Sequence, residues 1–97
     1  MVEFVTLWEA CTHDLFDETR QLLRQGVCVE HRGGKYKSTP LIAAAQNGNH
    51  HIVSLLLDAK ADMSAMDTCG MTAMHTATLH NKVSVVRTLL RHGDDVN

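Results

Sequence analysis

The sequence repeats itself at an interval of about 33 residues, and this restricts the possible folds more than any other feature. A shift of 33 superposes residues 39–57 on residues 72–90, and a shift of 34 places residues 7–23 under residues 41–57. Self-similarity at such a period is typical of stacked repeats, in which each unit buries its apolar face against its neighbours. The chain is therefore predicted to divide into residues 1–33, 34–66 and 67–97.

Each unit carries the signals of two short helices. Thr39 and Thr72 stand where an N-cap is expected, and Pro40 follows at the first helical position, where its missing N–H costs nothing. A second stretch with apolar residues at helical spacing follows in each unit, and we expect it to end near Gly26 and Gly93. The spacing therefore predicts a pair of helices in every repeat.

The connections between these helices are also readable. Asp14, Gly48 and Asn81 occupy equivalent corners, and all three residue types tolerate a left-handed backbone, so a positive φ is expected there. Residues 30–37 and 64–71 are polar and lack a helical period, and we expect both segments to project from the stack.

Two stretches of the sequence resemble the ankyrin repeat. Residues 39–48 read Thr-Pro-Leu-Ile-Ala-Ala-Ala-Gln-Asn-Gly and are followed by the apolar residues 52–57; the next unit has Thr-Ala-Met-His at 72–75 and Gly-Asp-Asp-Val-Asn at 93–97. The resemblance covers essentially the whole chain. It implies an all-α solenoid, in which antiparallel helix pairs stack side by side and β-hairpin-like fingers project from them.

The first repeat departs from the family pattern. Residues 5–11 lack the Thr-Pro-Leu-His motif, and the following finger carries one extra residue. Lys37 stands where the family has a finger glycine such as Gly70, so we expect Gly33 and Gly34 to build this turn instead. We expect residues 1–97 to form a single domain, with a cap-like first repeat and a third repeat that ends just short of its boundary without a C-terminal cap.

Composition excludes several classes of protein. A chain of 97 residues is about one small domain, and its net charge of −2 gives no general attraction to nucleic acid or acidic lipid. The longest apolar run, residues 52–57, is far shorter than the ~20 residues of a membrane helix, and the start lacks the features of a secretory signal. Three cysteines form no Cys-x-x-Cys pair or disulfide framework, so we expect an intracellular location, cytoplasmic or nuclear.

No pattern indicates catalysis, a cofactor or a metal. His75 and His80 are five residues apart, and the adjacent His50 and His51 are expected to point to different helix faces, so none forms the i, i+4 pair of a helical zinc site. The resemblance implies that His75 braces the cap at the start of its helix. Cys11 falls on a small inner-helix position and is expected to be buried, without a base to activate it. We therefore expect a non-enzymatic chain without a small-molecule substrate.

The ankyrin resemblance also implies where a partner binds: at the finger tips and on the exposed side of the inner helices. The predicted partner-binding residues are Thr12, His13, Arg32, Lys35, Tyr36, Ser38, Gln46, Asn47, Thr68, Cys69, Met71, Leu79 and His80. We expect these side chains to be free to vary, because neither cap nor core depends on them. Their chemistry predicts a protein partner with an acidic or hydroxyl-bearing element near Tyr36 and an apolar element near Leu79.

Charge is uneven along the first repeat. Glu9, Asp17 and Glu18 belong to an acidic stretch that we interpret as the polar outer face of a terminal repeat. The next stretch is basic, and Arg32, Lys35 and Lys37 surround Tyr36 in one finger. A tyrosine flanked by cations is typical of interface anchors, although an ordinary solvated loop explains the same pattern equally well.

The last repeat keeps a core-like face. Met74, Val86, Leu89 and Leu90 lack the polar pattern of a closing cap, so we expect either a longer array or self-association through this face. The sequence as a whole predicts a protein–protein interaction module that works as adaptor, scaffold or recognition domain. The alternatives are a substrate-recognition domain of a larger enzyme or ubiquitin-ligase assembly and, as a distant third, nucleic-acid or acidic-lipid binding through the basic finger.

Overall fold

The computed structural model describes residues 5–94, so the predictions that concern residues 1–4 and 95–97 lie outside the described part. Among these are the outer limits of the first and third repeats. Within residues 5–94 the chain forms α1 (Leu7–Thr12), α2 (Phe16–Arg24), α3 (Pro40–Asn47), α4 (His50–Asp58), α5 (Ala73–Leu79) and α6 (Val83–Asp94).

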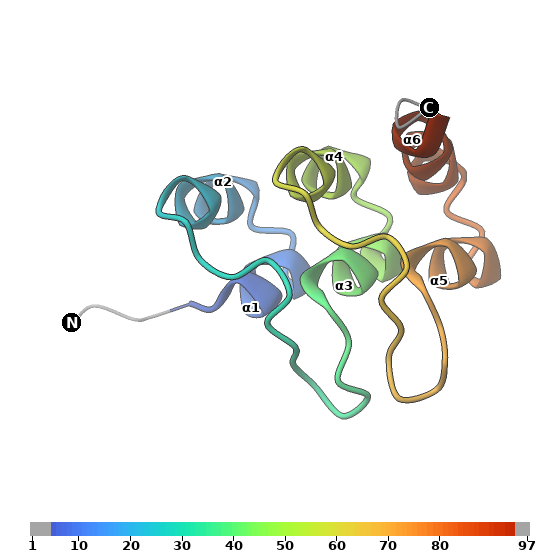
Figure 1. The fold of residues 1–97 in the computed structure, drawn as a ribbon, viewed down its shortest axis with the longest axis horizontal. Coiled ribbons are helices and arrows are strands. Elements are labelled where there is room, and N and C mark those ends of the chain that lie inside the picture. Colours follow the sequence, from blue (N-terminus) through green and yellow to red (C-terminus); the bar gives the residue numbers. More distant parts are fainter. Residues whose placement is uncertain (1–4, 95–97) are drawn as a thin grey trace.

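The helices lie in two rows. Figure 1 shows α1, α3 and α5 side by side as an inner row, with α2, α4 and α6 forming an outer row on one side of it. Two long loops project from the opposite side of the inner row. Each helix packs on its partner within a pair and on the matching helix of the next pair. The predicted all-α stack of antiparallel helix pairs is confirmed.

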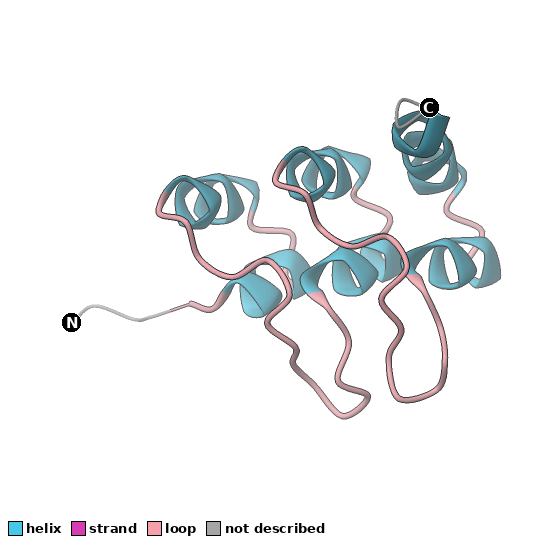
Figure 2. Cartoon of the chain, in the orientation of Figure 1, coloured by secondary structure: helices cyan, strands magenta, loops and turns pink. Residues whose placement is uncertain are grey.

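The two projecting loops are the predicted fingers. We call residues 33–38 finger 1 and residues 66–71 finger 2. Figure 2 draws both as loops, and the described residues contain no strand; finger 1 has a single antiparallel bridge between Gly33 and Ser38. The fingers are therefore hairpin-like turns held by a few hydrogen bonds rather than β-ribbons.

The inner helices begin at side-chain caps. Thr39 accepts a hydrogen bond from the Ile42 N–H with Pro40 in the first turn, and Thr72 accepts from the His75 N–H, so both predicted caps are confirmed. In α1 the cap is Thr6, whose hydroxyl accepts from the Glu9 N–H while the Glu9 carboxylate accepts from the Thr6 N–H. Glu9 was expected only to keep an outer face polar, and this reciprocal capping box gives it a specific structural role.

The corners between paired helices have the predicted backbone. Asp14, Gly48 and Asn81 have φ values of 60°, 79° and 59°. Gly26 follows α2 with a φ of 81°, but Gly93 lies inside α6 rather than beyond its end. Continuing through Gly93 costs about 1 kcal/mol relative to alanine, which the packing of a helix this long offsets.

The core lies between the two rows of helices. Leu41, Ile52, Val53, Leu56 and Leu89 are almost completely buried. The alanines of α3 are buried as well, and their small side chains allow the inner helices to approach closely. The outer helices thus supply most of these large apolar side chains, and the alanines of the inner row allow close contact between neighbouring helices.

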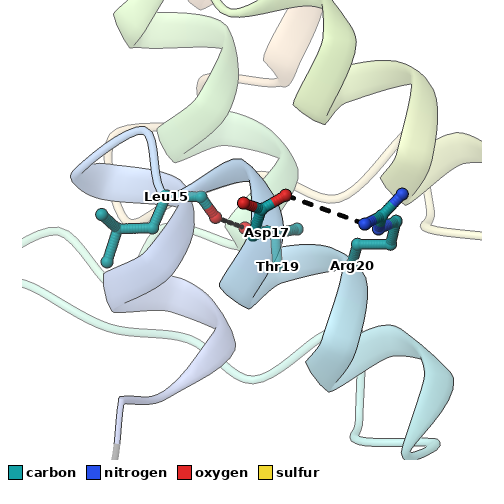
Figure 3. A network of polar contacts seen from close by, with 4 residues as sticks. All are labelled: Leu15, Asp17, Thr19 and Arg20. Atoms are coloured by element: carbon teal, nitrogen blue, oxygen red, sulfur yellow. Dashed lines mark hydrogen bonds and ion pairs between the residues drawn. The ribbon is translucent and has the colours of Figure 1, made fainter.

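A polar side chain is also buried where α1 meets α2. Thr19 is fully buried, and its hydroxyl donates a hydrogen bond of 2.7 Å to the Leu15 carbonyl (Figure 3). On the exposed side of the same helix Arg20 lies 3.8 Å from Asp17 (Figure 3). The buried hydroxyl therefore has a partner, as a polar group inside a protein requires.

No helix within residues 5–94 has the length and apolar character needed to cross a membrane.

Candidate functional site

A groove of about 410 Å³ lies where the two fingers meet the inner helices. Most of the predicted partner-binding residues line it. These are Thr12, Lys35, Tyr36, Ser38, Gln46, Cys69, Met71, Leu79 and His80. The structure thus brings together, in one concave site, residues of α1, α3, α5 and both fingers that the family resemblance pointed to. Binding by these residues stays a prediction.

Four of the predicted residues lie outside the lining of the groove. His13 and Thr68 are exposed, and the Thr68 N–H is used within the fold. The Asn47 amide donates to the carbonyls of Cys11 and Thr12 at the end of α1. Asn47 therefore ties α3 to α1, and Arg32 similarly ties the two fingers, so these side chains are not free to vary as the sequence suggested.

The lining also includes residues that the sequence analysis did not select. They are Trp8, Gly33, Gly34, Ile42, Asp67 and Thr76. The shift of 34 places Trp8 under Ile42, one turn before Thr12 and Gln46, and this alignment could have identified both residues as groove positions. Asp67 could not be found in this way, because its role depends on the turn that it forms.

Trp8 is the floor of the groove at its α1 end. The indole Nε1 donates a hydrogen bond of 2.9 Å to the Ser38 hydroxyl. Its ring lies against the backbone of finger 1, so closely that a Cβ added at Gly33 would lie 2.5 Å from Trp8 Cδ2, and one at Gly34 would lie 2.7 Å from Cζ2. Finger 1 is glycine-rich at this point because a side chain would collide with the indole.

The turn of finger 1 uses two left-handed residues. Gly34 has a φ of 78° and Lys37 a φ of 55°, and the Lys37 N–H donates to the Gly34 carbonyl. We expected the glycine pair to replace Lys37 in forming the turn. Lys37 nevertheless adopts the same left-handed backbone as Gly70 in finger 2, and Gly34 adds a second such residue to accommodate the longer finger.

Finger 2 is folded around one carboxylate. Asp67 Oδ1 accepts hydrogen bonds from the N–H groups of Cys69 and Met71, at 2.8 and 3.0 Å. The backbone of Asp67 also pairs with Met71 and Gly70. These bonds present Cys69 at the exposed tip and turn Met71 toward the groove.

The two fingers are joined by hydrogen bonds. The Thr68 N–H donates to the Tyr36 carbonyl at 2.9 Å. Arg32 Nη1 donates to the carbonyls of Lys37 and Met66, at 2.8 and 2.5 Å. The fingers therefore form one continuous wall, in which the guanidinium of Arg32 holds backbone groups from both.

Cations gather at the tip of finger 1. The ammonium group of Lys35 lies 5.6 Å from the centre of the Tyr36 ring, within the range of a cation–π contact. Among residues 5–94 the one ion pair is that of Arg20 with Asp17 on α2, so neither Lys35 nor Lys37 is paired with a carboxylate of this part of the chain. The tip consequently presents positive charge beside a half-exposed aromatic ring.

Cys11 is the buried cysteine of the described chain, and its surroundings hold the thiol in its neutral form. Burial raises the pKa of the Cys11 thiol to about 12, and the Asp14 charge adds to this, so the thiol stays protonated near neutral pH. The residue range 5–94 holds no cluster of His, Cys, Asp or Glu that could bind a metal ion. The groove residues can offer hydrogen bonds, charge and apolar surface to a ligand.

Two histidines differ from the sequence prediction. His50 and His51 were expected on different faces, but their ring centres lie 4.1 Å apart, and Phe16 meets His51 edge-on at 6.5 Å. His50 is the first residue of α4, where no preceding turn restricts its side chain, so the ring can fold against its neighbour.

The predicted brace by His75 is confirmed. Its Nδ1 lies 3.2 Å from the backbone nitrogen of Thr72, whose N–H donates to it, and 3.1 Å from the Thr72 hydroxyl oxygen.

The outer face of α5 and α6 is a second exposed apolar surface. Val83 and Leu90 are 52% and 54% exposed, and Met74 and Val86 are half-buried, whereas Leu89 is buried. Leu41, Val53 and Leu57, the equivalents of Met74, Val86 and Leu90 in the preceding helix pair, are buried. For example, Leu57 occupies the position of Leu90 and is only 8% exposed. The difference arises because α5 and α6 cover α3 and α4, while nothing in residues 5–94 covers α5 and α6.

Comparison with known proteins agrees with this architecture. A family model described as ankyrin repeats in three copies matches residues 7–97. The chain is 41% identical over 86 residues to the ankyrin repeat and SOCS box protein 5 of Bos taurus, and 34% identical over 87 residues to the human ankyrin repeat and SOCS box protein 11. These matches cover 89% and 90% of this chain but 25% and 26% of those proteins. The chain thus spans about a quarter of the length of these curated relatives.

A shorter match involves a different kind of relative. Over 60 residues the chain is 42% identical to the ankyrin repeat and SAM domain-containing protein 6 of Mus musculus, covering 61% of this chain and 7% of that protein. The ankyrin region is what these relatives and this chain have in common.

Proposed function

Since the chain belongs to the ankyrin-repeat family, whose repeats are protein-interaction modules, we propose that its groove binds an extended segment of a protein partner. The partner places an acidic or hydroxyl-bearing group near Tyr36 and Lys35 and an apolar side chain near Leu79 and Met71. The chain acts by recognition, as an adaptor or scaffold, and ankyrin domains in general are binding modules rather than catalysts.

The observation that carries this proposal is the contrast between the two ends of the groove. At one end Lys35 carries a charge that no carboxylate of residues 5–94 neutralises, beside the Tyr36 ring, which is 51% exposed. At the other end Leu79 is 70% exposed and lines the groove together with Met71, so this end offers apolar surface to a partner. Trp8 and Ile42 provide apolar floor between them.

The proposal is tested by selecting peptides from a random display library on the 97-residue chain. Tyr36→Ala and Leu79→Ala are combined in one variant, because both side chains are exposed and neither belongs to the buried core. Glu18→Ala, on the exposed surface of α2, serves as the matched control. We expect selected peptides to carry an acidic and a bulky apolar residue, to bind the control as they bind the unmodified chain, and to lose at least about tenfold in affinity for the double variant.

Trp8 gives an internal readout for the same experiment. It is the single tryptophan of the chain and lies in the groove, so a bound peptide should change its fluorescence. Peptides that bind the double variant as tightly as the unmodified chain, or that leave the fluorescence of Trp8 unchanged, would show that the groove is not the binding site.

A second candidate function is substrate recognition within a larger enzyme or ubiquitin-ligase assembly. It is supported by relatives whose names include a SOCS box besides ankyrin repeats, and of which this chain spans about a quarter. In this case the groove selects the substrate and other parts of the assembly act on it. The full-length transcript and the proteins that co-purify with its product distinguish this function from that of a simple adaptor.

The exposed face of α5 and α6 supports a related proposal. We propose three repeats at residues 1–33, 34–66 and 67–97, with the apolar face of the third covered either by a further repeat of a longer array or by a second copy of the chain. Light scattering of the 97-residue chain over a range of concentrations tests self-association, which a dimer would indicate. A strictly monomeric, stable protein with no flanking sequence would contradict both possibilities.

The remaining proposals concern charge and location. Nucleic-acid or acidic-lipid binding through Arg32, Lys35 and Lys37 is disfavoured by the net charge of −2. Such binding would weaken steeply as the salt concentration rises, and this dependence is its test. An intracellular location, cytoplasmic or nuclear, agrees with three cysteines that are all free in the structure. Fluorescent tagging of the full-length protein tests the location directly.

A further inference from the structure

We infer that Trp8 is the positioning residue of this groove: its indole fixes finger 1 and, through finger 1, the placement of finger 2. The inference rests on the proposed function, since it concerns how the same groove is held ready for a partner. It assigns to Trp8 a role that reaches beyond its own contacts, because finger 2 is bonded to finger 1 rather than to the indole.

The first step is that Trp8 is itself fixed. It lies on α1, a helix of six residues whose Leu7, Ala10 and Cys11 are buried in the core. The carbonyl of Trp8 accepts a hydrogen bond of 2.8 Å from the Thr12 hydroxyl. The short helix is therefore a rigid support from which the indole projects toward the finger.

The second step is that the indole holds finger 1. The bond from Nε1 to Ser38 and the close packing on Gly33 and Gly34 both act at the base of the turn, where Gly33 and Ser38 also pair with each other. Beyond this base, residues 34–37 are exposed. A turn with so few buried groups opens easily unless something fixes its base.

The third step is the connection to finger 2. The Thr68 N–H bonds to the Tyr36 carbonyl, and Arg32 bonds to the carbonyls of Lys37 and Met66. Each of these bonds needs finger 1 in its observed place. If finger 1 is displaced at Gly33, its hydrogen bond to the Thr68 N–H is disturbed. Finger 2, which forms the edge of the groove opposite Lys35, then loses its support.

The contact between the Trp8 indole and Gly33 can be tested by substituting either partner. Gly33 does not have a positive φ, and the three atoms nearest to a Cβ added there all belong to the indole of Trp8, the first at 2.5 Å. Gly33→Ala should therefore displace finger 1 in the unmodified chain and be harmless in Trp8→Ala, where the obstruction is gone. The two substitutions must be non-additive if the contact is what matters.

The experiment measures amide hydrogen exchange by NMR on the 97-residue chain and on Trp8→Ala, Gly33→Ala, the double variant and Ser38→Ala. Phe16→Ala, which removes another aromatic side chain at the surface, is the control. We expect exchange at Thr68 and Ser38 to rise by about tenfold in each of the first two variants, the consequence of losing one or two hydrogen bonds. The double variant should exchange no faster than Trp8→Ala alone, and Ser38→Ala should produce a smaller increase.

The outcomes that overturn the inference are equally specific. Unchanged exchange at Thr68 in Trp8→Ala would mean that finger 2 is held independently of the indole. Equal increases from Gly33→Ala in both backgrounds would mean that the contact with the indole is irrelevant. If Trp8→Ala raised exchange in α3 and α4 as much as in the fingers, the indole would stabilise the whole fold and not position the fingers.

Conservative replacement adds a readout that does not depend on how well Trp8→Ala folds. Trp8→Phe keeps an aromatic ring against Gly33 but loses the bond to Ser38, so we expect it to restore most of the protection at Thr68; exchange as fast as in Trp8→Ala would contradict the inference. Because none of these measurements involves a partner, a negative result leaves the proposed binding function standing. A failed peptide selection, in turn, leaves the role of Trp8 unaffected.

Discussion

Equivalent leucines in the last two helix pairs should respond very differently to the same substitution. Leu57 in α4 and Leu90 in α6 are 33 residues apart and occupy the same position of the repeat, yet they are 8% and 54% exposed. Both lie inside helices, so the change in helix propensity on replacement by alanine cancels between them. The comparison therefore isolates burial by the next helix pair.

The magnitudes follow from burial. Replacing a buried leucine by alanine costs about 3–5 kcal/mol, which includes the cavity left behind, so Leu57→Ala is expected at the lower end of this range. About half of the Leu90 side chain already contacts water, which leaves about 1 kcal/mol or less to lose and no closed cavity to create. We therefore expect a difference of about 2 kcal/mol between the two variants.

Urea unfolding followed by circular dichroism measures this difference, because the transition midpoint moves in proportion to stability when the slope is unchanged. The measurement is made at two protein concentrations that differ by a factor of at least about 50, since a dimer would gain stability with concentration. If Leu90→Ala destabilised the chain as much as Leu57→Ala, the face of α6 would be covered in solution and the reasoning from exposure would be refuted.

Three further predictions concern single contacts. Thr39→Ala removes the cap of α3, whose partner is the Ile42 N–H, and should cost about 1 kcal/mol in urea unfolding, while Thr39→Ser should cost less because it keeps the hydroxyl. Asn47→Ala leaves carbonyls at the end of α1 without their donor and should cost about 1–2 kcal/mol; an unchanged midpoint would show that water replaces the amide fully. For Cys11 the folded pKa of about 12 exceeds the ordinary pKa of 9.0, so above pH 9 the folded state retains a proton that the unfolded state loses. Stability should therefore be unaffected by this thiol below about pH 8 and fall as pH rises from 9 toward 12, and the decline should be smaller in Cys11→Ala. Equal declines in both proteins would contradict a raised pKa.

Much of the fold could be predicted because local signals and the repeat agree. Thr39, Thr72, Asp14 and Asn81 each determine one cap or corner through their own chemistry, and the period of about 33 residues places them in equivalent positions. The failures concern residues whose role depends on a neighbour in space. Glu9 was interpreted as a surface charge because the start of α1, one residue later than the repeat suggested, is visible only in the structure.

The lining of the groove was predictable in outline, but the hydrogen bonds that hold its parts in place were not. The family pattern located the groove, but it treated Ser38, Asn47 and Arg32 as freely variable positions, and each of them holds another element in place. The sequence could not reveal this, because all three bonds join residues that lie in different elements or different fingers. Long-range hydrogen bonds leave no periodic trace in a sequence.

The unusual composition of finger 1 and the tryptophan at its base are related, because the glycines of the finger pack directly on the indole. Where the pattern of the later repeats has Ile42 and His75, the first repeat has Trp8, and its larger ring occupies the space in which a finger of ordinary composition would lie. Gly33 and Gly34 lack the side chains that would collide with this ring, and finger 1 still reaches finger 2 through the Tyr36 carbonyl. The departures of the first repeat from the family pattern are therefore coupled, and changing one of them alone should disturb the groove more than changing them together.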